Sequence, residues 1–225
     1  MKVDLHCHSH FSDGKHPPEY LLSRAERNQL THLAITDHDY LAPTYAGDDS
    51  KVKLIPGVEI SCLWERVEIH IVGLLVDPAN QLLQQLLLSQ QHKRKQRIAD
   101  IDKLLNKQAV TGLMQYLEEL QCISYTRSHV ADFLVESGLC KDRKRAFRSY
   151  LGHGGKLYIK ADWCSIPAAI NGIKQAGGIA VLAHPSRYPL GKNKLERLLT
   201  DFSECGGEGL ETCYGSSDKP TVDKL

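Results

Sequence analysis

The first sixteen residues, MKVDLHCHSHFSDGKH, hold a dense group of side chains that can bind metal ions. The group comprises His6, His8, His10, Asp13 and His16. In a β-strand, residues i and i+2 point to the same side, so His6 and His8 project together if the first strand continues through them. Two imidazoles on one side provide half of a site for a divalent metal ion. Asp13 follows at a turn marked by Gly14 and adds a carboxylate.

Four further candidate ligands lie in or just after apolar segments. His38 follows one such segment in ITDHD, and His184 ends another in IAVLAHP. Glu59 interrupts PGVEIS and His70 interrupts VEIHIVG. A carboxylate inside an apolar strand is costly unless something pairs with it. Each of the first five predicted strands therefore carries a candidate ligand at or near its carboxyl end, where parallel barrels place their sites.

Six segments are predicted to be strands, and most of them alternate with helices. The predicted strands are 2–5, 32–36, 53–61, 67–76, 179–185 and 208–214. The predicted helices that flank them are 16–30, 165–178 and 192–202. This alternation predicts an α/β fold with a parallel sheet.

The segment between the fourth and fifth strands is too long for an ordinary connection and has a helical pattern. We predict an inserted helical cap subdomain at residues 78–152, with the barrel formed by residues 1–77 and 153–225. Residues 92–160 contain fourteen Lys and Arg against seven Asp and Glu, a net charge of +7, in a chain whose total is +1. This excess is either a solvated helix face or a positive cap that faces an anionic substrate.

Composition excludes several classes of protein. The seven cysteines are scattered and contain no CxxC pair, which argues against a disulfide framework or a zinc ribbon. No segment reads as a signal peptide or approaches the ~20 apolar residues of a membrane span. We therefore expect a cytoplasmic protein with reduced thiols and no membrane association, and nothing in the sequence implies a protein partner.

Five motifs together resemble the PHP family, which is named for its polymerase and histidinol-phosphatase members. They are DLHCHSHFSDG, ITDHD, PGVEIS, EIHIVG and AHP. The segments TRSHVADFLVESG, YIKADWC and AHPSRY look most like a branch of small bacterial PHP phosphoesterases. Members of that branch are described as 3′,5′-nucleoside bisphosphate phosphatases and as exonucleases acting at RNA 5′ ends. The resemblance implies a distorted (β/α)7-type barrel with a trinuclear metal site at the carboxyl ends of its strands.

The resemblance also implies which side chains hold the ions. His6 and His8 are implied for a first ion, Asp13 and His38 for a second, and His70 and His184 for a third, with Glu59 bridging the first and third. Manganese is the usual metal of this branch, while zinc or iron serves other members, and the mixed donor set suits all three. Such ions lower the pKa of a bound water and offset charge on phosphate oxygens, so no side-chain nucleophile is needed.

Three more residues are candidates for binding the substrate, a nucleotide or the 5′ end of an RNA. The resemblance implies that Arg127 and His129, in TRSH, hold a second phosphate, and that Arg187 reaches a phosphate from the barrel rim. As single residues, the two arginines also fit ordinary surface positions, and His129 fits an ordinary helix position. Cys7, between two of the ligands, is expected to point the other way and pack in the core.

The sequence departs from the family pattern in two places. The stretch after His38 is short for a helix that the family has there. The family also closes its site with a Gly-Ser-Asp-x-His motif on its last strand, and no such motif follows Tyr214. We therefore expect the C-terminal strand to be missing and the first two metal sites to lack a ligand each. Two alternatives remain open: a catalytically inactive relic that binds metal or nucleotide, and a histidinol-phosphatase-type phosphatase.

Overall fold

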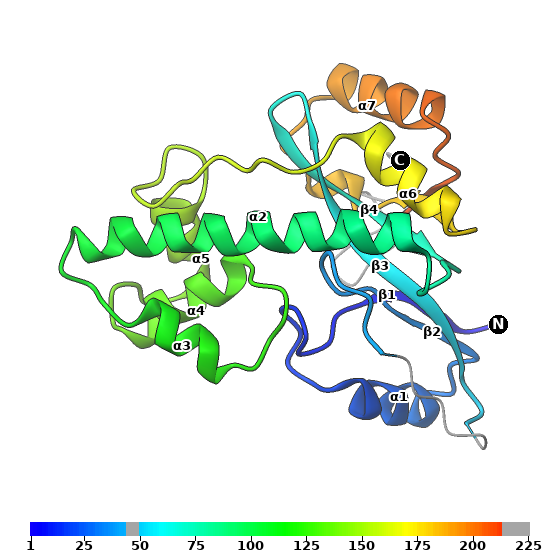
Figure 1. Cartoon of the computed structure of the whole chain (residues 1–225), viewed down its shortest axis with the longest axis horizontal. Helices are drawn as coiled ribbons and strands as arrows, with labels where there is room; N and C mark the ends of the chain where they lie inside the picture. Colours follow the sequence, from blue (N-terminus) through cyan, green and yellow to red (C-terminus); the bar gives the residue numbers. More distant parts are fainter. Residues whose placement is uncertain (44–49, 213–225) are drawn as a thin grey trace.

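The computed structural model describes residues 1–43 and 50–212, which form one mixed sheet, helices on its faces, and a helical cap (Figure 1). The sheet has six strands in the order β1-β2-β3-β4-β5-β6. Their bounds are β1 Val3–Cys7, β2 His32–Ile35, β3 Lys53–Trp64, β4 Val67–Leu74, β5 Ile179–Leu182 and β6 Gly209–Leu210. The expected α/β class is confirmed, and the sheet curls into a half-barrel. The expectation that the closing strand and its motif are missing concerns residues 213–225, which lie outside the described residues, as does part of the stretch after His38.

The direction of β4 corrects the expectation of a parallel sheet. β1, β2 and β3 run parallel, as do β5 and β6, but β4 is antiparallel to both of its neighbours. Only Glu65 and Arg66 separate β3 from β4, and so short a connection permits a hairpin but no crossover helix. His70 therefore enters the site from the middle of an antiparallel strand, not from a carboxyl end.

The β3–β4 hairpin separates an apolar face from a polar face. Ile60 and Cys62 on β3, and Ile69 and Ile71 on β4, are fully buried in the main hydrophobic cluster. This cluster packs against α6 (Ile166–Gln175) and α7 (Lys192–Glu204). The alternate positions point to the opposite face. They carry the polar side chains Glu59 and Ser61 on β3 and Glu68 and His70 on β4.

A smaller cluster lies at the other end of the sheet. It contains Leu33 and Ile35 of β2, and α1 (Pro18–Arg27) contributes Ala25 to it. Cys7 packs against this cluster, and its Sγ donates a hydrogen bond to the Ala34 carbonyl. Its side chain therefore points away from the polar face, as strand alternation predicts.

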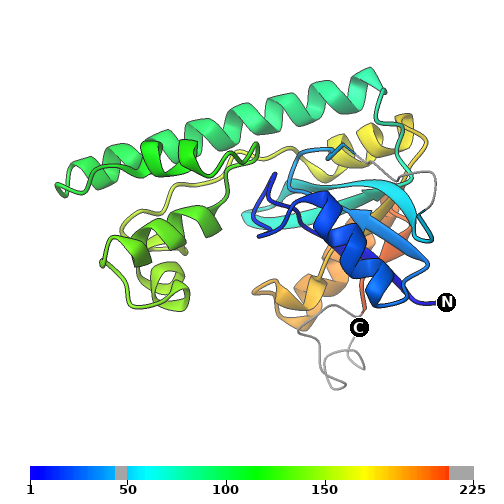
Figure 2. The same cartoon turned by 90° about the horizontal axis from the view of Figure 1, so that it is seen from below.

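The cap is built on one long helix that also belongs to the sheet core. It contains α2 (Gln81–Asn106), α3 (Leu113–Glu119), α4 (Arg127–Glu136), α5 (Arg143–Ala146) and the π-helical turn η1 (Phe147–Leu151). Leu83 and Leu87 of α2 join the main cluster, whereas Ile98 and Ile101 belong to a separate apolar cluster within the cap. In two perpendicular views, α2 extends from the sheet to the far end of the cap (Figures 1 and 2). Among the described residues, no helix is long and apolar enough to cross a membrane.

Candidate metal centre

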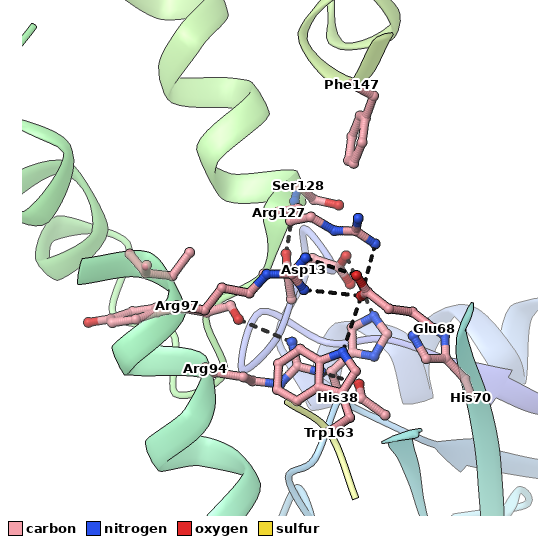
Figure 3. A pocket seen from close by; sticks show the side chains of 14 residues that line it. Asp13, His38, Glu68, His70, Arg94, Arg97, Arg127, Ser128, Phe147 and Trp163 are labelled. Atoms are coloured by element: carbon pink, nitrogen blue, oxygen red, sulfur yellow. Dashed lines mark hydrogen bonds and ion pairs between the residues drawn. The ribbon is translucent and has the colours of Figure 1, made fainter. Parts of the chain in front are cut away.

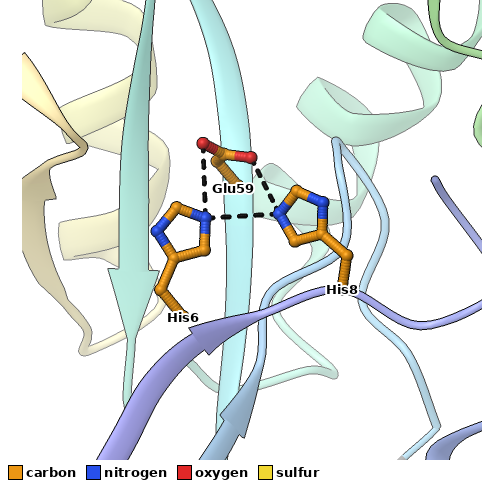
Figure 4. Close-up of side chains that lie close together, drawn as sticks. All are labelled: His6, His8 and Glu59. Atoms are coloured by element: carbon orange, nitrogen blue, oxygen red, sulfur yellow. Dashed lines mark hydrogen bonds and ion pairs between the residues drawn. The ribbon is translucent and has the colours of Figure 1, made fainter. Parts of the chain in front are cut away.

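Five imidazoles converge on the buried carboxylate of Glu59, which is 0% exposed. Oε1 of Glu59 lies 3.4 Å from Nε2 of His6, 3.0 Å from Nδ1 of His70 and 2.9 Å from Nε2 of His184. Oε2 lies 3.0 Å from Nε2 of His8 and 2.9 Å from Nδ1 of His38. Figure 4 shows His6 and His8 approaching the two oxygens of Glu59 from the end of β1.

Strand geometry accounts for most of this convergence. His6 lies in β1 and His8 directly follows it, and their Nε2 atoms are 3.2 Å apart, as the i and i+2 spacing predicts. Glu59 occupies the polar face of β3, and His38 forms an isolated bridge with it after β2. His70 enters from the neighbouring strand β4, with Nδ1 3.3 Å from Nε2 of His184.

His184 reaches the centre through an unusual backbone conformation. Its φ of 30° lies in the left-handed region, which costs free energy in a residue other than glycine. It immediately precedes the short helix η2 (Pro185–Arg187), and this turn directs the ring back toward Glu59. Strained backbone of this kind persists only where surrounding contacts hold it in place.

Asp13 adds a second carboxylate at the edge of the centre. Its Oδ1 lies 2.7 Å from Nδ1 of His8, and its Oδ2 lies 3.9 Å from Nε2 of His38. The loop that carries Asp13 is fixed by Asp37, whose carboxylate accepts hydrogen bonds from the hydroxyls of Ser9 and Ser12. The centre therefore combines five imidazoles with two carboxylates.

The electrostatics of the centre keep both carboxylates ionised. Burial raises the pKa of Glu59, but the nearby His70 and His38 outweigh it and hold this pKa well below its usual value. Burial lowers the pKa of His8, whereas its hydrogen bonds to Asp13 and Glu59 raise it to about 10. Ionised carboxylates surrounded by imidazole nitrogens form an environment that stabilises cations.

The donor atoms fit divalent metal ions. Ligands about 2.1 Å from an ion lie about 3.0–3.4 Å from one another, and the contacts around Glu59 span 2.9–3.4 Å. Nδ1 of His38 and Oε2 of Glu59 are both buried and lie 2.9 Å apart without the alignment of a hydrogen bond, a geometry that suits two donor atoms of one ion. The Nε2 atoms of His6 and His8 face each other. A proton between them is bonded to one nitrogen only, whereas a metal ion can accept the lone pairs of both.

Within residues 1–43 and 50–212, three groups of donor atoms have the spacing of a metal site. They are His6, His8 and Glu59; His8, Asp13 and His38; and His38, Glu59 and His70. In each group the ligand atoms lie within 4.8 Å of one another. With His184, these groups contain all seven residues that the sequence analysis named as ligands. His10, His16, His32, His92 and His153 belong to none of them.

Comparison with known proteins places this centre in a family. The PHP domain model matches residues 4–161. The chain belongs to the PHP family. The 5′-3′ exoribonuclease Rnm of Escherichia coli is 40% identical over 227 residues, covering 97% of this chain and 78% of the relative. The 3′,5′-nucleoside bisphosphate phosphatase of Chromobacterium violaceum is 38% identical over 231 residues, covering 99% of this chain and 80% of the relative. These names confirm the expectation of a PHP phosphoesterase.

Solved structures agree with this assignment. An amidohydrolase from Chromobacterium violaceum, solved with bound sulfate and no metal, superposes with a TM-score of 0.89 at 35% identity. The alignment covers 100% of this chain and 81% of that one. A protein from Bifidobacterium adolescentis, provisionally named a metal-dependent phosphoesterase, gives a TM-score of 0.81 at 27% identity, covering 100% and 82% of the two chains. The PHP fold is thus common to chains of low identity.

The PHP centre opens into a groove of about 1220 Å³ that Arg127 and Arg187 also line. A smaller cavity of about 160 Å³ adjoins it beneath the cap (Figure 3). Both spaces share Asp13, His38, His70, Arg127 and Phe147. Arg127 and Arg187 therefore both line the groove at the PHP centre, and their binding of phosphate stays a prediction.

His129 does not reach this space. It is 7% exposed, its Nδ1 accepts a hydrogen bond from the Thr126 amide, and its Nε2 lies 2.9 Å from the Ser12 carbonyl. The first contact is part of the capping box at the N-terminus of α4. The second contact joins the helical cap to the loop before Asp13. The expectation that His129 binds substrate is corrected, because both ring nitrogens already serve the fold.

Several residues of the PHP site were not predicted from sequence. Arg97 makes two hydrogen bonds to the Glu68 carboxylate at 2.9 and 3.0 Å, and the same carboxylate accepts one from the Trp163 indole. Glu68 precedes His70 by two residues on one strand, so the period of two could have indicated it. Glu211 hydrogen-bonds His6 at 2.6 Å, but it follows a strand of two residues that carries no pattern.

Proposed function

We propose that this chain is a metal-dependent phosphoesterase that removes phosphate from nucleotides, including 3′,5′-bisphosphates, or releases 5′ nucleotides from RNA. The observation that carries the proposal is the convergence of five imidazoles on the ionised, buried Glu59 at the floor of an open groove. The activities for which the Escherichia coli and Chromobacterium violaceum relatives are named support the choice of substrate.

We propose that the centre holds up to three divalent ions, with manganese the first choice and zinc or iron the alternatives. His6 and His8 would hold one, Asp13 and His38 a second, and His70 and His184 a third, with Glu59 between the first and third. Bound ions of this kind lower the pKa of a water molecule and offset charge on phosphate oxygens. The role of the protein is to hold the seven ligands at fixed spacing around the ionised carboxylate of Glu59.

Arg127 is the cap residue best placed to contact the substrate. It makes a single ion pair with Glu68 at 3.2 Å, and its side chain is 30% exposed. Arg97 holds the same carboxylate through two shorter contacts and is 7% exposed. Arg127 can therefore turn to an entering phosphate while Arg97 keeps Glu68 in place. Arg187 also lines the groove and offers a second cation.

The basic cap favours a nucleotide over histidinol phosphate. Residues 92–160 carry a net charge of +7, and a substrate with a second phosphate gains more from that field than an amine does. We propose that residues 78–152 act as this cap, and that residues 1–77 and 153–225 form the barrel that carries the metal centre.

The test compares phosphate release from 3′-phospho-AMP, AMP and histidinol phosphate, and nucleotide release from a 5′-phosphorylated RNA. Manganese-loaded protein is expected to act on 3′-phospho-AMP or RNA and to ignore plain AMP. Faster release from histidinol phosphate would favour a histidinol-phosphatase-type enzyme. Failure on every substrate, by protein that binds manganese, would favour a catalytically inactive metal-binding protein.

A further inference from the structure

The carboxylate of Glu211 joins two of the proposed ligands without entering the ligand groups. Its Oε1 lies 2.6 Å from Nδ1 of His6, and its Oε2 accepts a hydrogen bond of 2.7 Å from the backbone amide of His184. The Glu211 side chain is 14% exposed and lines the groove. Both oxygens are thus engaged by neighbouring residues.

The backbone of Glu211 explains how one side chain reaches both partners. Glu211 directly follows β6, and its amide donates a hydrogen bond of 3.0 Å to the Leu182 carbonyl at the end of β5. Its side chain can therefore extend over the end of β5 to the His184 amide. β1 and β6 are the two outer strands of the described sheet, and the contact with His6 bridges the open side between them.

Each contact fixes a different property of its partner. A carboxylate on Nδ1 of His6 selects the tautomer that carries the proton there, which leaves the lone pair of Nε2 facing Glu59 and His8. The contact to the His184 amide holds a backbone whose φ is 30°, a conformation that needs external support. One residue therefore controls a ring orientation at one end of the centre and a backbone turn at the other.

We infer that Glu211 is a positioning residue that sets the metal affinity of the centre through His6 and His184 without binding an ion itself. The inference rests on the proposed metal centre. It does not depend on which substrate the enzyme hydrolyses, because metal binding can be measured without one.

The test measures manganese affinity of the Glu211→Gln variant by competition with a chromophoric chelator. The amide keeps the size of the side chain but is a weaker acceptor for His6, and the loss of such a partner costs roughly 10–100-fold in metal affinity. Glu208→Gln is the matched control, because Glu208 lies three residues earlier, is exposed and pairs with Lys174. Glu208→Gln is expected to bind manganese as the wild type does.

Two outcomes would overturn the inference. Wild-type manganese affinity in a folded Glu211→Gln protein would reduce Glu211 to a structural contact. Complete loss of one ion at saturating manganese would make Glu211 a direct ligand. Failure of phosphate release in wild-type protein that binds manganese would affect the proposed function and leave this inference standing.

A second measurement uses the wild-type protein and does not depend on the folding of a variant. Zinc-loaded protein is diamagnetic, and long-range nitrogen–proton correlation spectra report which ring nitrogen of each histidine is protonated. His6 is expected to carry its proton on Nδ1. A proton on Nε2 of His6 would contradict the arrangement directly.

Discussion

At the residue scale, Glu59 is the central residue of the proposed metal site. Its two oxygens face five imidazole nitrogens, and its pKa lies well below the usual value because His70 and His38 favour the ionised form over the opposing effect of burial. We predict that Glu59→Gln loses most of the bound manganese and the phosphatase activity together, because a neutral amide is a weak ligand. Elemental analysis and phosphate release measure the two effects.

Glu65→Gln serves as the control for this substitution. Glu65 lies on the β3–β4 turn, is exposed and forms a surface ion pair with Arg197. Its loss is expected to change neither manganese content nor activity, since exposed pairs contribute little. A folded Glu59→Gln protein with the manganese content of the wild type would remove Glu59 from the centre.

Arg127 provides the second prediction at this scale. We predict that Arg127→Ala raises KM for 3′-phospho-AMP roughly tenfold and changes kcat little, because we propose that the side chain binds the second phosphate and is not a metal ligand. The difference from wild type should shrink as salt rises, because salt screens charges that are partly exposed. Steady-state kinetics at two ionic strengths measure it, with exposed Arg24→Ala on α1 as the control. A wild-type KM of the Arg127→Ala enzyme at low salt would mean that Arg127 is an ordinary surface residue and does not bind the substrate.

At the scale of single elements, the β3–β4 hairpin places a partly buried ion pair between Glu68 and Arg97 beneath the cap. Burial raises the pKa of Glu68, but Arg97 and Arg127 outweigh it and lower the pKa to about 2. A lowered pKa contributes stability that is present above pH ~4.5 and is lost as pH falls toward 2. We predict that Glu68→Gln costs roughly 3 kcal/mol at pH 7, and that this cost shrinks progressively below pH ~4.5.

Urea unfolding of the metal-free protein at pH 7, 5 and 3.5 measures this dependence. Chelator is present throughout, so that the titration of the metal centre does not mask the ion pair. The Glu65→Gln variant corrects for the removal of one surface charge. A cost that stays constant from pH 7 to pH 3.5 would show that the Glu68 charge does not stabilise the fold.

The elements also explain how much of the site the sequence could predict. His6 and His8 were predictable because the period of two in a strand fixes their common side, and Glu59 because a carboxylate in an apolar strand requires partners. The direction of β4 was not predicted, because parallel and antiparallel strands share the same local pattern and only the two-residue connection differs. His129 was misassigned because its capping role depends on a loop more than one hundred residues away.

At the scale of the whole molecule, Arg94 of α2 joins the cap to the metal centre. It donates hydrogen bonds to Asp39 Oδ2 at 2.7 Å, to Ser61 Oγ at 2.6 Å and to the Tyr125 carbonyl at 3.1 Å. These partners lie directly after His38, on β3, and just before α4. Arg94 and Asp39 are 5% and 0% exposed, so each charge depends on the other. A shift of α2 would therefore reach His38 through Asp39.

We predict that Arg94→Met destabilises the metal-free protein by roughly 3–5 kcal/mol, because it leaves Asp39 buried and uncompensated. Adding Asp39→Asn should recover part of this loss, since it removes the buried charge, and asparagine tolerates the left-handed φ of 48° at that position. Urea unfolding of the four proteins gives the coupling energy of the pair. If the unfolding free-energy losses of the two single variants add up to that of the double variant, Arg94 and Asp39 act independently. In that case α2 would hold the cap through apolar packing alone. A substantial coupling, accompanied by weaker manganese binding in Arg94→Met, would show that the cap helix and the His38 loop respond as one unit.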